Sequence, residues 1–406
     1  MPNINLTGSD GDLGNRYITK EYLMTVYPQI AGQLITPELW GWGLNTSYQL
    51  GDTTLTNKCT PVTTFAGGAN WKQVAGASVG DRMAAIKTDG TLWIWASGAN
   101  GDGANTANFF ATPVTTFAGG TDWKQVSSGN MHIAAIKTDG TLWTWGFNAQ
   151  GQLGNNTAIN RSTPVTTFAG GTNWKQVAGG YYCTASIKTD GTLWTWGRNN
   201  YGQLGDNTTT DRSTPVTTFA GGTNWKQVAC GGNTGGNSAT VVAIKTDGTL
   251  WTWGRNNFGQ LGDNTTTDRS TPVTTFAGGT NWKQVSAGTY HTSAIKTDGT
   301  LWTWGYNNYG QLGVPSSASR SIPVTTTAGG TNWKQVSCGG FHTASIKTDG
   351  TLWTWGRNSY GQLGDTTKTQ RNDPITTFAG GTNWKQVSGG YQYTVAIKTS
   401  DDLQGI

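Results

Sequence analysis

The sequence has few residues of the kinds that build metal centres, disulfide frameworks or catalytic sites. It has four cysteines and three histidines in 406 residues, and no two cysteines form a Cys-x-x-Cys pair. Neither a zinc site nor a dense disulfide framework is therefore expected. Only 12% of the residues are charged, and the net charge of +5 argues weakly against a nucleic-acid binder, which usually has a concentrated basic face.

Long hydrophobic runs are also missing. No stretch has the length and apolarity of a membrane span, so membrane insertion is not expected. The first residues, MPNINLTGSDGDLG, contain no basic segment followed by an apolar run, so no signal peptide is predicted.

Glycine and tryptophan are abundant, with 60 and 21 copies, and the tryptophans are periodic. Three markers recur seven times: a Trp-x-Trp pair, an [ND]WKQV segment and an IKT segment. Three tryptophans in each of seven units account for every tryptophan of the chain. A unit of about 50 residues repeated in this way predicts a repeat architecture, with the large tryptophan rings as its core.

Each unit is predicted to form four short strands. KQVS starts the first, and TSAIKT alternates small or polar with apolar residues, as a half-buried strand does. Asp298-Gly299 then precedes TLWTWG, and Asp-Gly between two such runs predicts a hairpin with a type I′ turn. TPVTT, with proline near its start, suits an outer edge strand. Repeated four-stranded units indicate an all-β, seven-bladed β-propeller of four-stranded antiparallel blades.

The ends of the repeat array are complementary. The first copy of the hairpin has only its second half, ELWGWG at 38–43, and the last has only its first half, VAIKT at 395–399. Together they complete a seventh blade, which closes the ring and removes exposed strand edges. The predicted organisation is an N-terminal arm at 1–37, the propeller at 38–399 and a C-terminal tail at 400–406.

The segment 338–364 contains GGFHT, an alternating strand that ends in TDG, then LWTWG and an N-x-x-GQLG loop. This pattern resembles the regulator of chromosome condensation repeat family over about residues 38–399, and the resemblance implies a seven-bladed propeller. The nuclear exchange factor of that family depends on features outside the common repeat, and no inserted wedge or basic tail is found here. Plant ultraviolet-B receptors of similar fold use a Gly-Trp-Arg-His-Thr motif, whose tryptophan this sequence lacks, so light sensing is not expected.

The first 37 residues lie outside the repeat. A short helix is predicted at 19–27, where Tyr22, Leu23, Val26 and Tyr27 form one apolar face. The segment resembles leader segments of virion proteins of marine phages. Two interpretations stay open: an arm packed on its own propeller, and a docking segment for another virion subunit.

The candidate chemistry of the chain is sparse. His132, His291 and His342 occupy the same repeat position, where other copies have Cys183 or Tyr393, which a metal site or catalytic base would not tolerate. The family resemblance implies a structural histidine that forms a hydrogen bond within its blade. Carboxylates in the loops at 206–211 and 263–268 offer oxygen ligands for Ca²⁺, but a solvated loop is the preferred interpretation. No enzyme activity, cofactor or metal is therefore predicted.

Two groups of loop residues are candidate contact sites. The divergent second unit contains Phe109 and Phe110 in a polar surface loop, and they mark either a contact site or a decaying repeat. The repeated loops also place arginines beside aromatic residues, which suits a multivalent rim or a glycan-binding surface. The rim residues are Arg198, Tyr201, Arg255, Phe258, Arg357 and Tyr360.

The preferred functional hypothesis is a non-enzymatic structural or binding protein of a phage particle, such as a decoration, tail or fibre module. Its partners would be other virion proteins and a host surface receptor or glycan, with no nucleic acid, and its location would be the virion. The alternatives are a cytoplasmic propeller for protein interaction or nucleotide exchange, and a lectin-like propeller.

Overall fold

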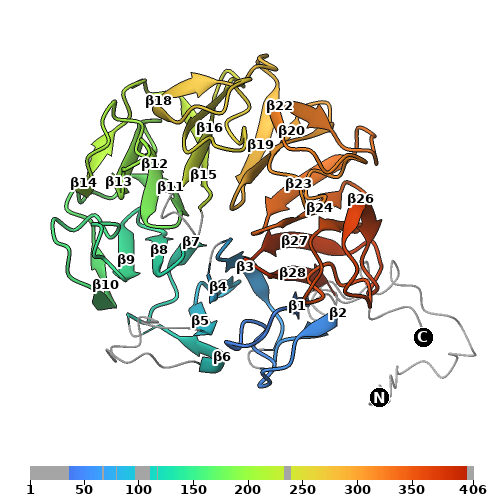
Figure 1. Ribbon diagram of the computed structural model, residues 1–406. Coiled ribbons are helices and arrows are strands. Elements are labelled where there is room, and N and C mark those ends of the chain that lie inside the picture. The colour runs from blue at the N-terminus through green and yellow to red at the C-terminus, as the bar shows by residue number, and fades with distance from the viewer. Residues whose placement is uncertain are drawn as a thin grey trace, which may run out of the picture.

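Short strands assemble in groups of four around a central axis. The computed structural model describes residues 36–65, 68–78, 80–96, 110–116, 118–232 and 239–399, and these contain 28 strands in seven antiparallel sheets (Figure 1). The predicted seven-bladed propeller is therefore confirmed. The arm residues Tyr22, Leu23, Val26 and Tyr27 lie outside the described residues, as does Phe109.

Six blades are continuous in sequence, and their strands run outward from the axis in chain order. Blade 1 comprises β3 (Trp71–Gly76), β4 (Arg82–Lys87), β5 (Leu92–Ala96) and β6 (Phe110–Thr115); blade 2, β7 (Trp123–Ser128), β8 (His132–Lys137), β9 (Leu142–Gly146) and β10 (Arg161–Thr166); blade 3, β11 (Trp174–Gly179), β12 (Cys183–Lys188), β13 (Leu193–Gly197) and β14 (Arg212–Thr217). Blade 4 comprises β15 (Trp225–Cys230), β16 (Thr240–Lys245), β17 (Leu250–Gly254) and β18 (Arg269–Thr274); blade 5, β19 (Trp282–Ala287), β20 (His291–Lys296), β21 (Leu301–Gly305) and β22 (Arg320–Thr325); blade 6, β23 (Trp333–Cys338), β24 (His342–Lys347), β25 (Leu352–Gly356) and β26 (Arg371–Thr376).

The seventh sheet is shared between the two ends of the chain. Its strand order is β2-β1-β28-β27, with β27 (Trp384–Gly389), β28 (Tyr393–Thr399), β1 (Pro37–Gly43) and β2 (Lys58–Thr63). Strand β1 pairs with β28 along its whole length, from Pro37 opposite Thr399 to Gly43 opposite Tyr393. The predicted closure of the ring by complementary half-hairpins is therefore confirmed.

The hairpins form where Asp-Gly predicted them, but with a different turn. In the hairpin from β4 to β5, the Gly90 N–H donates to the Lys87 carbonyl and the Lys87 N–H donates to the Thr91 carbonyl. Only Gly90 has a positive φ, of 80°, and Asp89 does not, whereas a type I′ turn needs positive φ at both central residues. The prediction of a type I′ turn was wrong, because the turn is one residue longer and only the glycine adopts the left-handed conformation.

Tryptophan rings fill the space between blades, but not all to the same depth. Fourteen of them are at most 1% exposed, whereas the first tryptophan of each Trp-x-Trp pair, such as Trp93, is only partly buried. Neighbouring rings pack mostly edge to face, as Trp71 and Trp93 do at 6.1 Å. The predicted tryptophan core is therefore confirmed for two rings of each blade, and the third lies near the surface.

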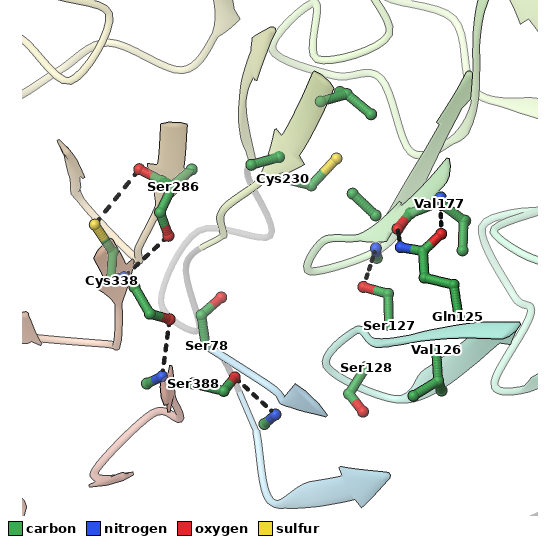
Figure 2. A pocket seen from close by; sticks show the side chains of 18 of the residues that line it. Ser78, Gln125, Val126, Ser127, Ser128, Val177, Cys230, Ser286, Cys338 and Ser388 are labelled. Carbon is green, nitrogen blue, oxygen red and sulfur yellow. Dashed lines mark hydrogen bonds between the residues drawn. The ribbon is translucent and has the colours of Figure 1, made fainter. Parts of the chain in front are cut away.

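A ring of glutamine side chains connects the innermost strands. The Gln125 side-chain amide donates to the Val177 carbonyl of the next blade, and its oxygen accepts the Val177 N–H (Figure 2). The same pair of bonds, 2.9–3.2 Å long, joins every blade to the next and ends with Gln386 on Val74. The amides thus satisfy backbone groups on the inner edge of each sheet, where no further strand follows.

Deleting β1 should open the ring. We expect a chain that starts at residue 44 to melt about 10 °C or more below a chain that starts at residue 36, because it loses a strand and the fully buried Trp42. Differential scanning calorimetry measures the difference, and size-exclusion chromatography shows whether the exposed edge of β28 causes association. Equal melting temperatures and a monomeric truncated chain would contradict the closure.

Replacing one glutamine of the ring should weaken a single blade contact. We expect Gln284→Leu to lower the free energy of unfolding by about 2–4 kcal/mol, because it leaves the Val336 N–H and carbonyl without partners. Gln284→Glu should also destabilise the fold, since its carboxylate accepts the Val336 N–H but cannot donate to the Val336 carbonyl. Urea unfolding measures both, and the exposed neighbour Lys283→Leu is the control, which should stay within about 0.5 kcal/mol of the parent.

Candidate functional site

The two faces of the propeller carry different side chains. At one end of each blade lie the loop between the first and second strands and the loop between the third and fourth strands. This end contains the predicted rim residues, and we call it the arginine–aromatic face. The other end, where IKT and TDG lie, carries lysines, and we call it the lysine face.

Aromatic side chains form a connected cluster on the arginine–aromatic face. Phe258 lies 4.7 Å from Tyr306, ring centre to ring centre, and Tyr309 lies 5.3 Å from Phe341. Tyr290 contacts Phe258, Tyr306 and Phe341, with ring centres 5.1–5.8 Å apart. Tyr391, on the closing blade, extends the cluster from Phe341 at 5.9 Å. These rings come from four consecutive blades, and each is only partly buried.

The structure brings several of the predicted rim residues into contact. The Arg255 guanidinium stacks on Tyr201 of the preceding blade, 4.4 Å from the ring centre. The Arg357 guanidinium lies over Tyr309 at 5.1 Å and near Tyr360 at 5.9 Å. Cation–π contacts at these distances hold the guanidinium groups against the rings.

The rim arginines differ from a second set of arginines in their charge partners. Arg212, Arg269 and Arg371 each form a salt bridge of 2.9–3.0 Å with an aspartate of the loop. Arg198, Arg255 and Arg357 instead donate from Nε to a neutral side-chain oxygen two residues later. No described carboxylate lies within salt-bridge distance of these three, so their charge is available to an anionic group of a partner.

Sequence reasoning missed much of the cluster. Tyr290 and Phe341 directly precede the histidine position, and Tyr306 directly follows a TWG segment. The sequence feature that could have identified these residues is that their positions vary between otherwise nearly identical units. Burial raises the pKa of Tyr290, against a smaller lowering by Arg255, and burial also raises the pKa of Tyr306. Both phenols therefore stay protonated at neutral pH and can donate hydrogen bonds.

The predicted loop position of Phe110 needs correction. Phe110 begins strand β6, opposite Ala96, and packs partly buried against the core around Leu39 and Trp95. It is therefore part of a blade rather than a surface loop, because the strand starts directly after the divergent segment.

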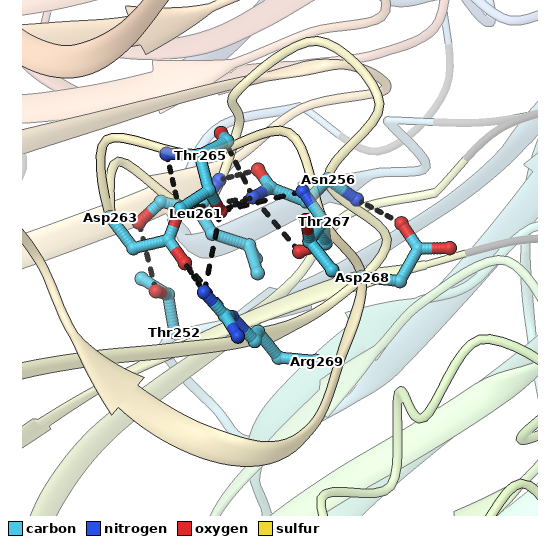
Figure 3. A network of polar contacts seen from close by, with 8 residues as sticks. All are labelled: Thr252, Asn256, Leu261, Asp263, Thr265, Thr267, Asp268 and Arg269. Carbon is cyan, nitrogen blue, oxygen red and sulfur yellow. Dashed lines mark hydrogen bonds and ion pairs between the residues drawn. The ribbon is translucent and has the colours of Figure 1, made fainter.

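The acidic loops are held together by their own hydrogen bonds (Figure 3). Asp263 Oδ1 accepts hydrogen bonds from Asn256, from the Thr265 N–H and from the Thr265 hydroxyl, and Oδ2 pairs with Arg269. Burial alone would raise the pKa of Asp263, but the bonds from Thr265 and Arg269 outweigh it and lower the pKa overall. Asp268 accepts the Asn256 N–H. The carboxylates thus shape the loop, and no group of three metal-binding side chains occurs within the described ranges.

The histidines connect neighbouring blades. His132 Nε2 lies 2.8 Å from Thr184 Oγ1 of the next blade, and this hydroxyl donates to the Gln152 carbonyl. The Nε2 must therefore carry the proton and donate. His291 and His342 make equivalent contacts with Thr343 and Thr394. The expectation of a bond within the blade was wrong, because the side chain points out of its own sheet toward the neighbouring one.

Burial keeps these histidines neutral. Each is at most 1% exposed, and burial lowers the pKa of each to about 3, with Arg82 adding to the effect at His132. In the closing blade Tyr393 takes the same position, and its hydroxyl donates to the Arg82 carbonyl of blade 1. In these four blades the position therefore makes a contact between blades, whereas Thr240, at the same position of blade 4, donates to the Arg255 carbonyl within its own blade.

Two thiols meet at the same kind of interface. Cys230 is buried and hydrogen-bonded to Cys183 of the preceding blade, and this contact and burial raise its pKa well above the usual range. Cys338 is also buried, which confirms the expectation of a small buried residue at its position and that of Cys230. Both cysteines line a cavity of about 220 Å³ along the axis, together with Ser127, Ser286 and other inner-strand residues (Figure 2).

The neutral histidines should make the propeller sensitive to mild acid. An unfolded histidine takes up a proton near pH 6.5, whereas the folded chain resists protonation down to about pH 3. Stability is therefore complete above pH 6.5 and falls below it, by up to about 1.4 kcal/mol per pH unit for each histidine.

The measurement is the free energy of unfolding between pH 7.5 and 4.5. This range lies above the window of Asp206, Asp263 and Asp365, whose pKa values are lowered from 3.8. His342→Gln keeps a donor for Thr394 and should reduce the pH slope by about one third. An unchanged slope would show that the histidines do not cause the acid sensitivity.

The described residues include no helix of the length and apolarity that crossing a bilayer requires.

Known proteins share both the repeat and the fold of this chain. It is 33% identical to the ultraviolet-B receptor UVR8 of Arabidopsis thaliana over 261 residues, which cover 63% of this chain and 58% of the receptor. It is 29% identical to the human E3 ubiquitin-protein ligase HERC2 over 381 residues, 90% of this chain and 8% of the ligase. The chain thus spans little more than half of the receptor and a small part of the ligase.

Solved structures agree on the fold. Yeast RCC1 (Prp20), solved with Kap60, superimposes with a TM-score of 0.77 at 18% identity, over 91% of this chain and 90% of that chain. Human WBSCR16 superimposes with a TM-score of 0.76 at 19% identity, over 90% of this chain and 99% of that chain.

The regulator of chromosome condensation (RCC1) repeat matches residues 139–187, 190–235, 247–295, 298–346 and 349–397. A second description of the same repeat also covers 123–152 in blade 2. Since these matches cover more than half of the chain, the protein belongs to the RCC1 repeat family and is a seven-bladed propeller binding scaffold of that family.

Proposed function

We propose that this protein is a non-enzymatic interaction propeller that binds a partner protein through its arginine–aromatic face. The supporting observation is the aromatic cluster flanked by Arg255 and Arg357, neither of which has a described carboxylate partner. Aromatic residues and arginine supply most of the binding energy in protein interfaces. The rigid ring holds these side chains in place before a partner arrives, which lowers the entropic cost of binding.

The chemistry of the face defines the partner. Half-buried rings between two guanidinium groups suit an apolar side chain flanked by carboxylates, since arginine binds carboxylates with two parallel hydrogen bonds. The partner is therefore a protein segment with an aromatic or aliphatic residue near acidic ones.

The relatives of this chain support the alternative of a propeller for protein interaction or nucleotide exchange better than the virion role. The relatives named above are plant and animal proteins, and Prp20p of Saccharomyces cerevisiae, which shares the fold, has binding properties to Gsp1p and histones. The phage-like leader that favoured the virion role belongs to the arm at 1–37, of which residues 1–35 lie outside the described residues. The lectin alternative relies on Tyr201, Phe258 and Tyr360, but Phe258 packs edge to face against Tyr290 and Tyr306. A sugar needs an open ring face, so this packing favours a protein partner.

Photo-crosslinking tests the proposal. Benzoylphenylalanine at position 309 should form a discrete adduct with a cellular protein, identified by mass spectrometry. The adduct should fall about tenfold or more when Phe341→Ala and Arg357→Ala are added, because these remove the anchor beside position 309.

The matched control places the same crosslinker at Phe276, which is 64% exposed and lies at the lysine-face end of its blade. An adduct that forms equally at both positions, or that persists in the double variant, would contradict a specific site. Binding on a glycan array that falls with Tyr201→Ala and Tyr360→Ala would favour the lectin alternative instead.

A further inference from the structure

The lysine face collects most of the lysines of the chain. In each blade the first strand begins with Trp-Lys and the second ends with Ile-Lys, and pairing places these two ends together, as Trp71 opposite Lys87 shows. All seven blades repeat this arrangement. Fourteen of the seventeen lysines therefore lie on one face.

These lysines form two rings. The inner ring is exposed and surrounds the axis on the first strands: Lys72, Lys124, Lys175, Lys226, Lys283, Lys334 and Lys385. None of its members has a described carboxylate oxygen within 4.0 Å. The outer ring lies over pairs of tryptophans, 4.3–5.7 Å from the ring centres: Lys87, Lys137, Lys188, Lys245, Lys296, Lys347 and Lys398.

The acidic groups of this face do not neutralise it. The six turn aspartates, such as Asp89, use one oxygen to accept hydrogen bonds from the threonine two residues later. With Asp122 and Glu38 they make eight carboxylates against fourteen lysines, a net charge of +6 on the described part of this face. The net charge of the whole chain, +5, therefore does not reveal that positive charge is concentrated on this face.

Exposed phenylalanines occur at the same end of the blades. Each lies two residues after an outer strand, and the five that the structure describes are 64–74% exposed: Phe65, Phe168, Phe219, Phe276 and Phe378. The chain then crosses toward the next inner strand along the lysine face, where the Trp174 N–H donates to the turn carbonyl of Gly140. Each phenylalanine N–H donates to a glycine carbonyl of the QLG segment, as Phe168 does to Gly154, so the rings form an apolar rim on the circumference of the propeller, at the edge of the basic face.

We propose that the lysine face docks on an anionic lipid bilayer. Phosphatidylserine-type headgroups attract lysines near the surface, and exposed aromatic rings insert at the boundary between headgroups and acyl chains. A nucleic acid would use the lysines but leave the phenylalanine rim without a role, so the rim favours the bilayer. Peripheral docking needs no spanning segment. The arginine–aromatic face is at the opposite end of the blades and stays free for its own partner.

Vesicle co-sedimentation tests this inference. The protein should bind vesicles of roughly seven parts phosphatidylcholine to three parts phosphatidylserine, and not pure phosphatidylcholine vesicles, at about 100 mM NaCl. Lys124→Glu, Lys226→Glu and Lys334→Glu together should weaken binding at least about 100-fold. Phe168→Ser, Phe219→Ser and Phe276→Ser together should weaken it about tenfold or more while keeping its salt dependence.

A variant with the same change in net charge is the control. Arg198→Glu, Arg255→Glu and Arg357→Glu alter the opposite face and should leave vesicle binding within about twofold of the parent. Circular dichroism and the melting temperature establish that each variant is folded. Any variant that unfolds is replaced by its Lys→Ala or Phe→Thr counterpart.

Three results would overturn the proposal: no binding to anionic vesicles, equal loss in the lysine and arginine variants, or full binding by the phenylalanine variant. Binding to a duplex DNA of about 20 base pairs or to sodium polyphosphate without binding to vesicles would also overturn it, and would indicate a polyanion site. None of these results bears on crosslinking at position 309, so the two proposals fail independently.

Discussion

The glutamine ring around the axis is the interaction on which the rest of the structure depends. An innermost strand has a neighbour on one side only, and its other edge faces the axis with unpaired backbone groups. The preceding blade supplies an amide that pairs with both groups of one valine, as Gln125 does for Val177. A primary amide is suited to this role because it carries a donor and an acceptor side by side, like a peptide bond. Since Gln386 of the closing blade bonds to Val74 of blade 1, the glutamine ring is continuous around the axis.

Because the glutamine ring joins the blades at the axis, the loops at the two ends of the blades are not needed for that contact. The side chains at the two ends can therefore differ in chemistry. At one end the same loop position holds Tyr290 in one blade, Phe341 in the next and Tyr391 in the closing blade, and these rings meet across blade boundaries. At the other end the lysines are repeated without variation, and the cationic rings follow from the repeat itself. A single repeating unit thus produces one variable, cohesive face and one uniform, charged face.

The contacts between blades also explain where the fold is vulnerable. His132, Cys183 and Tyr393 stand at one repeat position, and each makes its contact from a buried site between two sheets. A buried histidine at this position must stay neutral, because protonation would bury an uncompensated charge. The stability of the ring therefore depends on pH. The salt-bridged loops, such as that of Asp263 and Arg269, lie nearer the surface and tolerate acid further.

The sequence by itself determined the number of blades, their four strands and the closure of the ring, because these follow from a period of about 50 residues and from strand patterns within one unit. Only the tertiary structure decided how units meet. The glutamine ring and the histidine contacts link residues about 52 positions apart, which no pattern within a unit reveals. The rim arginines were predicted from their loops. Tyr290, Tyr306 and Phe341 lie beside them only because the ring places the loops of neighbouring blades next to one another. Net charge is a sum over the chain and carries no direction, so the lysine face appeared only when the strands placed both lysines of every blade at the same end.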